Sequence, residues 1–199
     1  MQLRSEETHT RILEAAQKLF AQCGYDAAGV ADICALAGVS KGAFYHHFPS
    51  KQAVFLELLN NWLGSLDSRM DDIRQGVLSI PQMLIQMSSM MKEVFQAADG
   101  RLPMFLEFWT QSSRDATIWK ATIAPYHQYQ AFFTSLIQDG IDEGSLRKVN
   151  PSAAARVIIA LALGLLLQSL LDPHGADWEE VAKQGMQSLM AGLAEEARS

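Results

Sequence analysis

A group of polar side chains lies close together in this 199-residue chain: Ser40, Lys41, Tyr45, His46 and His47. Hydroxyl, ammonium, phenol and imidazole groups are suitable partners for the phosphate oxygens and base edges of DNA. Adjacent histidines on a helix point about 100° apart, so they cannot easily share one metal ion. The pattern therefore favours contact with nucleic acid over metal binding, and a solvated pair of histidines is the alternative.

Two short helices are predicted to position these side chains. The apolar spacing predicts one helix over residues 30–37, and Ser40 is placed to cap a second helix over residues 41–47. Between them Gly38 can adopt a positive φ, which permits a sharp reversal of the chain. This is helix-turn-helix geometry, in which the second helix presents its N-terminal end to the major groove. The apolar residues expected on the packing side are Ile33, Leu36, Phe44 and Phe48.

Around this motif, a longer set of residues falls at a recognisable spacing. It comprises Arg11-Ile12-Leu13-Glu14-Ala15-Ala16, Leu19-Phe20, Gly24-Tyr25, Val30, Ile33, Ala37-Gly38-Val39-Ser40-Lys41-Gly42, Phe44-Tyr45-His46-His47-Phe48 and Ser50-Lys51. In these residues the chain resembles the TetR family of bacterial transcriptional regulators. The resemblance implies an N-terminal three-helix DNA-binding domain joined to a larger helical domain for ligand binding and dimerisation.

The resemblance also implies which residues contact DNA. It places the helix over residues 41–47 in the major groove, with Tyr45, His47 and Lys51 on phosphates. The complete predicted set is Gly29, Val30, Ser40, Lys41, Gly42, Ala43, Tyr45, His46, His47 and Lys51. Position 29 is usually Thr or Ser in the family, so Gly29 keeps a backbone N–H for phosphate but lacks the hydroxyl. Cys34 stands where the family usually has Ala, and we expect it to be a buried packing residue.

The residue pattern predicts helices in the rest of the chain as well. Apolar residues recur at helical spacing and strand signals are nearly absent, which predicts an all-α fold of about nine helices. Ser50, Asn150 and Asp177 are each placed to cap a helix. We predict a helix-turn-helix domain over residues 1–51 and a helical ligand-binding and dimerisation domain over residues 52–199.

Methionines and aromatic residues gather in the middle of the chain. Such a stripe is usually core, but methionine repacks easily around varied apolar ligands. Taken together with a few polar groups, the set indicates a small-molecule site. The predicted ligand-binding residues are Trp62, Met83, Met87, Met90, Phe105, Phe108, Trp109 and Tyr126. Nearby carboxylates such as Glu107 indicate a cationic ligand only weakly, because carboxylates are common on exposed helix faces.

The last two predicted helices carry more apolar surface than one small domain covers. They form either an internal hairpin or a four-helix bundle with a second copy, and the family pattern favours the bundle. The predicted dimer residues are Val157, Leu161, Gly164, Leu165, Gln168, Trp178, Val181, Gly185, Met186 and Leu189. The most apolar run, residues 157–167, is shorter than the ~20 residues that cross a bilayer, so we expect no membrane partner.

These features predict a ligand-responsive transcriptional repressor. A homodimer would place two recognition helices about 34–36 Å apart on a pseudo-palindromic operator, and a small apolar or aromatic molecule in the C-terminal domain would release it. The alternatives are an effector-dependent activator and a ligand-binding protein of the same fold without DNA function. The sequence has no GxSxG, HExxH or glycine-rich phosphate motif, so we expect no enzyme. We also expect no metal or cofactor, and a cytoplasmic location because no secretory signal is evident.

Charge is distributed unevenly along the chain, whose formal net charge is −6. Residues 1–51 hold five basic and five acidic residues, so the acidity belongs to the remainder. Because residues 1–51 carry no net charge, few of their side chains can displace counterions from DNA. We therefore predict that the DNA affinity depends only weakly on salt. Binding to a DNA duplex measured at several salt concentrations checks this. A log–log slope of about −9, typical of a protein that neutralises on the order of ten phosphates, would contradict it.

Overall fold

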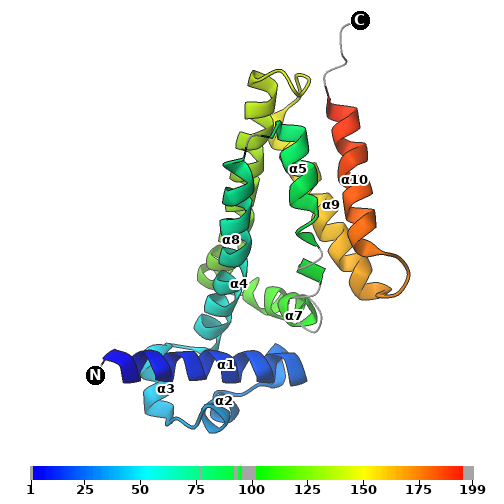
Figure 1. The fold of residues 1–199 in the computed structure, drawn as a ribbon. Helices are drawn as coiled ribbons and strands as arrows, with labels where there is room; N and C mark the ends of the chain where they lie inside the picture. The colour runs from blue at the N-terminus through cyan, green and yellow to red at the C-terminus, as the bar shows by residue number, and fades with distance from the viewer. Residues whose placement is uncertain (1, 77, 92–93, 96–101, 195–199) are drawn as a thin grey trace, which may run out of the picture. The chain divides into compact units, whose positions relative to one another are not determined.

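The computed structural model describes residues 2–76, 78–91, 94–95 and 102–194. Within these ranges the chain forms nine helices and no named strand, which confirms the predicted all-α class (Figure 1). The helices are α1 (Gln2–Ala27), α2 (Val30–Ala37), α3 (Lys41–His47), α4 (Lys51–Arg74), α5 (Ile80–Ser88), α7 (Leu102–Ser112), α8 (Ala116–Asp142), α9 (Pro151–Leu171) and α10 (Trp178–Leu193).

The chain divides into two compact units, which are described separately. Unit 1 consists of Met1–Gly64 and Gly100–Ala124, and unit 2 of Ser65–Asp99 and Pro125–Ser199. Both divisions fall inside long helices, α4 and α8, so each of these helices contributes residues to both units. Helix α7 therefore belongs to the same compact unit as the three N-terminal helices. The functional boundary predicted after residue 51 stays a prediction.

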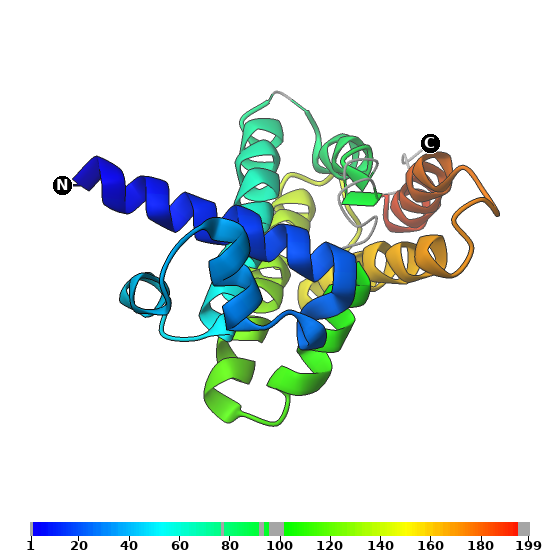
Figure 2. The same ribbon diagram turned by 90° about the horizontal axis from the view of Figure 1, so that it is seen from below.

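Unit 1 is built around the apolar stripe of α1. Ile12, Ala16 and Phe20 are each at most 1% exposed, as their helical spacing predicts. Helices α2, α3 and α7 pack against α1, and Figure 2 shows the two short helices beside it. Near its end α1 bends at Gly24, which has a φ of +84°. The helix thus continues past this glycine in a last short stretch up to Ala27.

Side-chain caps set the helix boundaries where the sequence places them. The Ser40 hydroxyl accepts a hydrogen bond from Ala43 N at 3.1 Å, and the observed bounds of α2 and α3 match the predicted ones. Asn150 caps α9 through Ala153 N at 3.0 Å, and Asp177 caps α10 through Glu180 N at 3.1 Å. Such caps satisfy backbone N–H groups that have no partner inside the helix.

Unit 2 has its own core, formed where α5 and α10 pack together and α9 packs on α10. Leu84, Leu136 and Ile137 are fully buried there. Methionines fill much of the remaining space, as expected for a flexible side chain among irregular helix contacts. The buried methionines of this core are Met70, Met83, Met87, Met90, Met186 and Met190.

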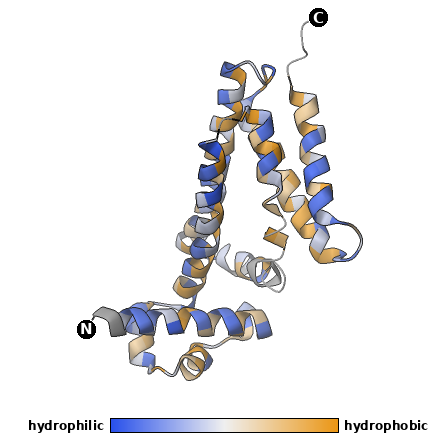
Figure 3. Cartoon of the chain, in the orientation of Figure 1, coloured by the Kyte–Doolittle hydropathy of each residue, from blue (hydrophilic) through white to orange (hydrophobic). Residues whose placement is uncertain are grey.

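Helix α9 is apolar around nearly its whole circumference (Figure 3). Taken whole, its 21 residues are long and apolar enough to cross a bilayer by length and composition, so the shortness of the run 157–167 does not by itself exclude a membrane span. One such helix is weak evidence for a membrane, because core helices of soluble proteins share these properties. Here α9 packs against α10, and only 28% of its apolar window is buried. Most of the apolar window of α9 is therefore not covered by the described residues of this chain.

Candidate nucleic-acid interface

The turn between α2 and α3 is fixed by its own backbone. Gly38 is in the left-handed region with a φ of +63°, and Val39 N donates to Cys34 O at 3.0 Å. Ser40 then caps α3, so the chain reverses within three residues. Because only glycine adopts this φ readily, the residue pattern and the turn agree. Cys34 is 5% exposed and packs in the core, as predicted.

Arg11 on α1 holds this turn from the side. Its Nη2 donates to the carbonyl oxygens of Ala37 and Gly38, the latter at 3.0 Å. A Cβ at Gly38 would lie 2.7 Å from the same nitrogen, so the glycine also makes room for the guanidinium. The position of the α2–α3 turn on α1 is therefore fixed by a cation bound to two backbone carbonyls.

Helix α3 buries one face and exposes the other. Phe44 is fully buried and Phe48 is 2% exposed, as predicted, whereas the Tyr45 side chain is 55% exposed. Five of the predicted DNA-contacting residues are exposed: Ser40, Lys41, Gly42, Tyr45 and His46. The other five are partly buried: Gly29, Val30, Ala43, His47 and Lys51. The prediction that Leu36 faces the core is wrong, since it is 47% exposed on the turn before Gly38.

Gly29 caps α2 without a side chain. Its backbone N–H donates to Asp32 Oδ2 at 3.2 Å, so this donor is engaged within the protein. The Asp32 carboxylate stabilises the positive end of the α2 dipole. The phosphate contact predicted for the Gly29 N–H therefore competes with this bond and remains a prediction.

Three histidines gather near the end of α3. His9 stacks on Phe48 with ring centroids 4.7 Å apart, and its Nε2 lies 3.1 Å from Glu57 Oε1. The His47 ring is 5.8 Å from that of His9. Burial, followed by the nearby His46 and His9, lowers the pKa of His47 below its ordinary value, which favours the neutral ring at pH 7. In the part of the chain that is described, no cluster of three or more ligating residues could hold a metal ion.

Lys51 is placed at the start of α4 and points toward the end of α1. Its Nζ donates to Tyr25 O at 2.7 Å and to Asp26 O at 3.3 Å, and lies 4.3 Å from the centre of the Tyr25 ring. Burial lowers the pKa of Lys51, while Asp26, Glu107 and Cys23 oppose that shift. The ammonium is thus a structural donor within unit 1, and its predicted role on phosphate is untested.

The predicted ligand residues are divided between the two units. In unit 1, Phe108 is 1% exposed and stacks on Phe55 with centroids 3.9 Å apart. Trp62 packs against the same core, Trp109 is 38% exposed, and the side chain of Phe105 lies outside the described residues.

In unit 2, the three predicted methionines Met83, Met87 and Met90 are at most 7% exposed. The Tyr126 hydroxyl accepts a hydrogen bond from Arg156 Nη1 at 2.9 Å. Within each unit the buried members form part of the core, and a ligand-binding role for the set stays a prediction.

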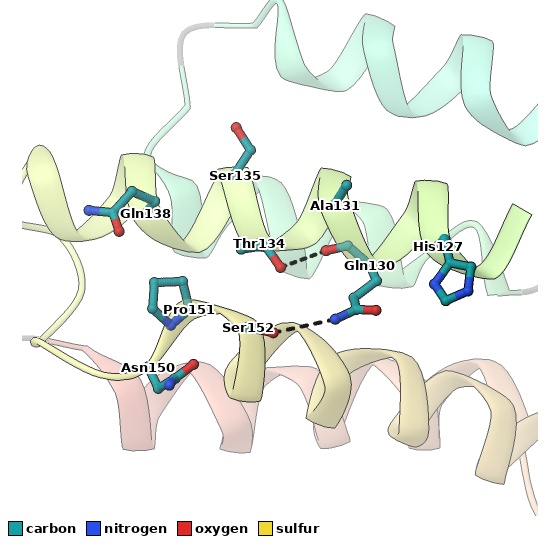
Figure 4. A pocket seen from close by; sticks show the side chains of 9 residues that line it. All are labelled: His127, Gln130, Ala131, Thr134, Ser135, Gln138, Asn150, Pro151 and Ser152. Atoms are coloured by element: carbon teal, nitrogen blue, oxygen red, sulfur yellow. Dashed lines mark hydrogen bonds between the residues drawn. The ribbon is translucent and has the colours of Figure 1, made fainter. Parts of the chain in front are cut away.

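Unit 2 also carries an open groove between α8 and the start of α9, with a volume of about 640 Å³ (Figure 4). Seven of its nine lining residues have polar side chains, and none of the predicted ligand residues is among the nine. Gln130 Nε2 spans it by donating to Ser152 Oγ at 3.3 Å. Polar residues at helical spacing on α8, such as Gln130, Thr134 and Gln138, were the only sequence signal for this groove.

The predicted dimer residues differ in their exposure. Leu165 and Met186 are both 7% exposed within the single chain, while Val157 is 50% exposed. A Cβ at Gly185 would lie 3.4 Å from Leu161 Cδ1, so these two residues meet within one chain. Of the other predicted residues, Gln168 is exposed and Gly164, Trp178, Val181 and Leu189 are partly buried. Sequence reasoning missed the exposed leucines of α9, which are Leu163, Leu167 and Leu171.

Comparison with known proteins identifies the class of protein that this geometry defines. A profile described as bacterial regulatory proteins of the tetR family matches residues 12–58. A second profile, described as the C-terminal part of BetI-type transcriptional repressors, matches residues 86–194. The HTH-type transcriptional regulator UidR of Escherichia coli K12 is 23% identical over 194 residues, which cover 97% of this chain and 96% of UidR.

Solved structures of regulators share the fold. A transcriptional regulator from Pseudomonas aeruginosa PAO1 superimposes with a TM-score of 0.81 at 24% identity, covering 92% of this chain and 88% of its own. A regulator from Saccharomonospora viridis, solved in complex with choline, gives a TM-score of 0.80 at 23% identity and covers 96% and 100%. The chain is therefore a helix-turn-helix transcriptional regulator. It belongs to the TetR family.

Gly42, on the exposed face of α3, offers a direct test of this interface. Within the protein, a Cβ there would meet only Ser40 Oγ, at 3.8 Å, so nothing internal requires glycine. Gly42→Ala should raise the free energy of unfolding by about 0.5–1 kcal/mol through helix propensity. It should also weaken binding to specific DNA by about tenfold or more, because a methyl group obstructs close approach of the groove.

Gly64→Ala in α4 is the matched control, since nothing lies within 4 Å of its Cβ position. It should stabilise the protein similarly without changing DNA affinity. Urea unfolding and fluorescence anisotropy with labelled DNA measure the two effects. Unchanged DNA affinity in Gly42→Ala would argue against α3 as the recognition helix.

Proposed function

We propose that this regulator is a repressor that binds a pseudo-palindromic operator as a homodimer and leaves it when a small molecule binds. The observation that carries the proposal is the match of residues 86–194 to the C-terminal part of BetI-type repressors, joined to a helix-turn-helix head. An effector-dependent activator and a ligand-binding protein without DNA function are the alternatives on the same fold.

The exposed face of α3 supports the DNA-binding part of the proposal. Lys41, Tyr45 and His46 project from a helix whose other face is anchored by the buried Phe44. Such a helix can enter the major groove without disturbing the core. Arg11 and the cap at Ser40 hold it in one orientation, so little conformational freedom is lost on binding.

For the effector, we propose a small molecule with an apolar or aromatic body. Support comes from the number of methionine and aromatic side chains in the segment from Trp62 to Tyr126. Choline in the Saccharomonospora viridis regulator shows a small organic cation bound to a protein of this fold. Quaternary ammonium compounds therefore belong among the candidates, although Glu107 is engaged by backbone N–H groups in this chain.

An electrophoretic mobility shift tests the proposal as a whole. The DNA consists of the region upstream of this gene and of duplexes that the protein selects from random sequence. We expect a specific shifted band that disappears when a compound raises the melting temperature of the protein. The compounds to screen are apolar amphiphiles, quaternary ammonium compounds and flavonoid-like aromatics, because bound ligand stabilises the folded state.

The outcomes separate the three functions. Compounds without a thermal shift should leave the band intact and serve as the control. A band that appears or strengthens with a stabilising compound would indicate an activator. If no duplex is selected or shifted, the ligand-binding protein without DNA function is the better description.

We propose that the dimer forms through the exposed apolar face of α9. Val157, Leu163, Leu167 and Leu171 are 45–76% exposed and lie on one side of the helix. The exposed Ala160 and the neighbouring Gly164, whose Cβ position is open, would allow close approach of a second helix. A row of large apolar side chains on a regulator marks an interaction surface. A second copy is the partner that fits, since two such faces form a closed, two-fold symmetric contact.

Leu167→Glu should convert the dimer to a monomer, because it places a charge at the centre of this apolar face. Sedimentation velocity measures the mass, and operator affinity should fall because two heads no longer bind together. Gln187→Glu, at an exposed position of α10, introduces the same charge and should leave the dimer intact. A dimeric Leu167→Glu protein would show that another surface forms the interface.

A further inference from the structure

The last turn of α1 is held by a residue far away in the sequence. At the kink after Gly24, Tyr25 N donates to Glu107 Oε2 at 2.8 Å and Asp26 N donates to Glu107 Oε1 at 2.9 Å. Each oxygen of this α7 carboxylate thus accepts a hydrogen bond from one of two successive backbone N–H groups of α1. Hydrogen bonds to an ionised carboxylate are among the stronger ones in proteins.

The backbone of the same two residues is also held by Lys51, through their carbonyl groups. Its ammonium accepts no hydrogen bond and donates to the carbonyl oxygens of Tyr25 and Asp26, so a cation of α4 faces an anion of α7 across the turn. We call the residues Tyr25, Asp26, Lys51 and Glu107 the junction clamp. It joins α1, α4 and α7 through charged groups on backbone atoms, all within unit 1.

Aromatic packing stiffens the junction clamp. Phe108, the residue after Glu107, meets the Tyr25 ring edge-on at 5.1 Å and stacks on Phe55 at 3.9 Å. Tyr25 itself is 1% exposed, and its buried hydroxyl has no hydrogen-bond partner among the described residues. A shift of α7 would therefore disturb a close-packed aromatic cluster as well as the two hydrogen bonds.

Gly24 is adapted to this arrangement. A Cβ at this position would lie 2.9 Å from Glu107 Oε2, and the φ of +84° is unfavourable for other residues. Glycine at position 24 thus permits both the kink and the close approach of the carboxylate. Two residues after Asp26 comes Ala28, which is 1% exposed, and Gly29 then caps α2. A displacement of the junction clamp would therefore also displace the start of α2.

We propose that α7 moves as part of the DNA-reading head and that Glu107 is the positioning residue that couples α7 to the orientation of α2 and α3. This deepens the proposed function and rests on it. Helix α4, which begins at Lys51 and contributes residues to both units, is one connection between the N-terminal helices and the rest of the chain. The junction clamp adds α7, because α7 cannot shift without carrying the end of α1 or leaving two backbone N–H groups unpaired beside a buried ring.

Coupling between two sites is reciprocal, so DNA binding at α3 must change the stability of α7 as much as α7 changes DNA binding. Hydrogen exchange followed by mass spectrometry can detect this without a known effector. The full-length protein is compared alone and with a duplex that it selects from random DNA. In the wild type, the duplex should slow exchange at least threefold in residues 24–28 and 102–112 as well as in α2 and α3.

Glu107→Gln replaces one acceptor oxygen by an NH₂ group and so removes one of the two hydrogen bonds between Glu107 and the end of α1. In this variant the duplex should still slow exchange in α2 and α3 but no longer in residues 102–112. Asp115→Asn is the matched control: Asp115 also accepts two backbone N–H groups in unit 1, those of Thr117 and Ile118, but only within its own turn. It should behave as the wild type does.

The outcomes distinguish this inference from the function on which it rests. Failure of any duplex to bind the wild type refutes the DNA-binding function. Slowed exchange in α2 and α3 without any change in residues 102–112 of the wild type overturns the coupling, whatever the variants do. Equal slowing of residues 102–112 in the wild type and in Glu107→Gln overturns the role of Glu107. If Glu107→Gln does not fold, the wild-type comparison alone still decides the coupling.

Discussion

The N-terminal part of this regulator depends on the contacts made by the backbone of two residues, Tyr25 and Asp26. Their N–H groups bind a carboxylate from α7 and their carbonyl groups bind an ammonium from α4. Charged groups are strong partners for backbone atoms, and the Tyr25 side chain beside them is buried. The end of α1 therefore has one position relative to its neighbours. Because α2 begins three residues later, the position of the end of α1 also sets the position of α2 and α3.

The same preference for backbone partners explains how a head of zero formal charge can contain five basic residues and still offer few of them to DNA. Arg11 binds the carbonyl groups of the α2–α3 turn, and Lys51 binds those at the end of α1. Both side chains are engaged within the protein. In our proposal, DNA recognition therefore depends more on fit and on polar groups such as Tyr45 than on counterion release by Arg11 and Lys51.

The second unit follows a different constraint, that of burying an almost wholly apolar helix. Helix α9 covers part of its surface with α10 and a methionine-rich core, yet leaves a row of leucines exposed. A helix that is apolar on all sides is stable in water only if something covers the remainder. In our proposal, a second copy of the chain covers the exposed leucines, because its own α9 presents the same row.

The sequence by itself determined the features that arise from contacts within a few residues. The bounds of α2 and α3, the cap at Ser40, the left-handed Gly38 and the stripe of Ile12, Ala16 and Phe20 all follow from local spacing. Only the tertiary structure decided where long-range partners lie. Glu107 meets Tyr25 across 82 positions, and no local pattern indicates that bond. The exposure of Leu36 and the outward face of α9 were also undetermined, because an apolar residue or an all-apolar helix carries no sign of which side is covered.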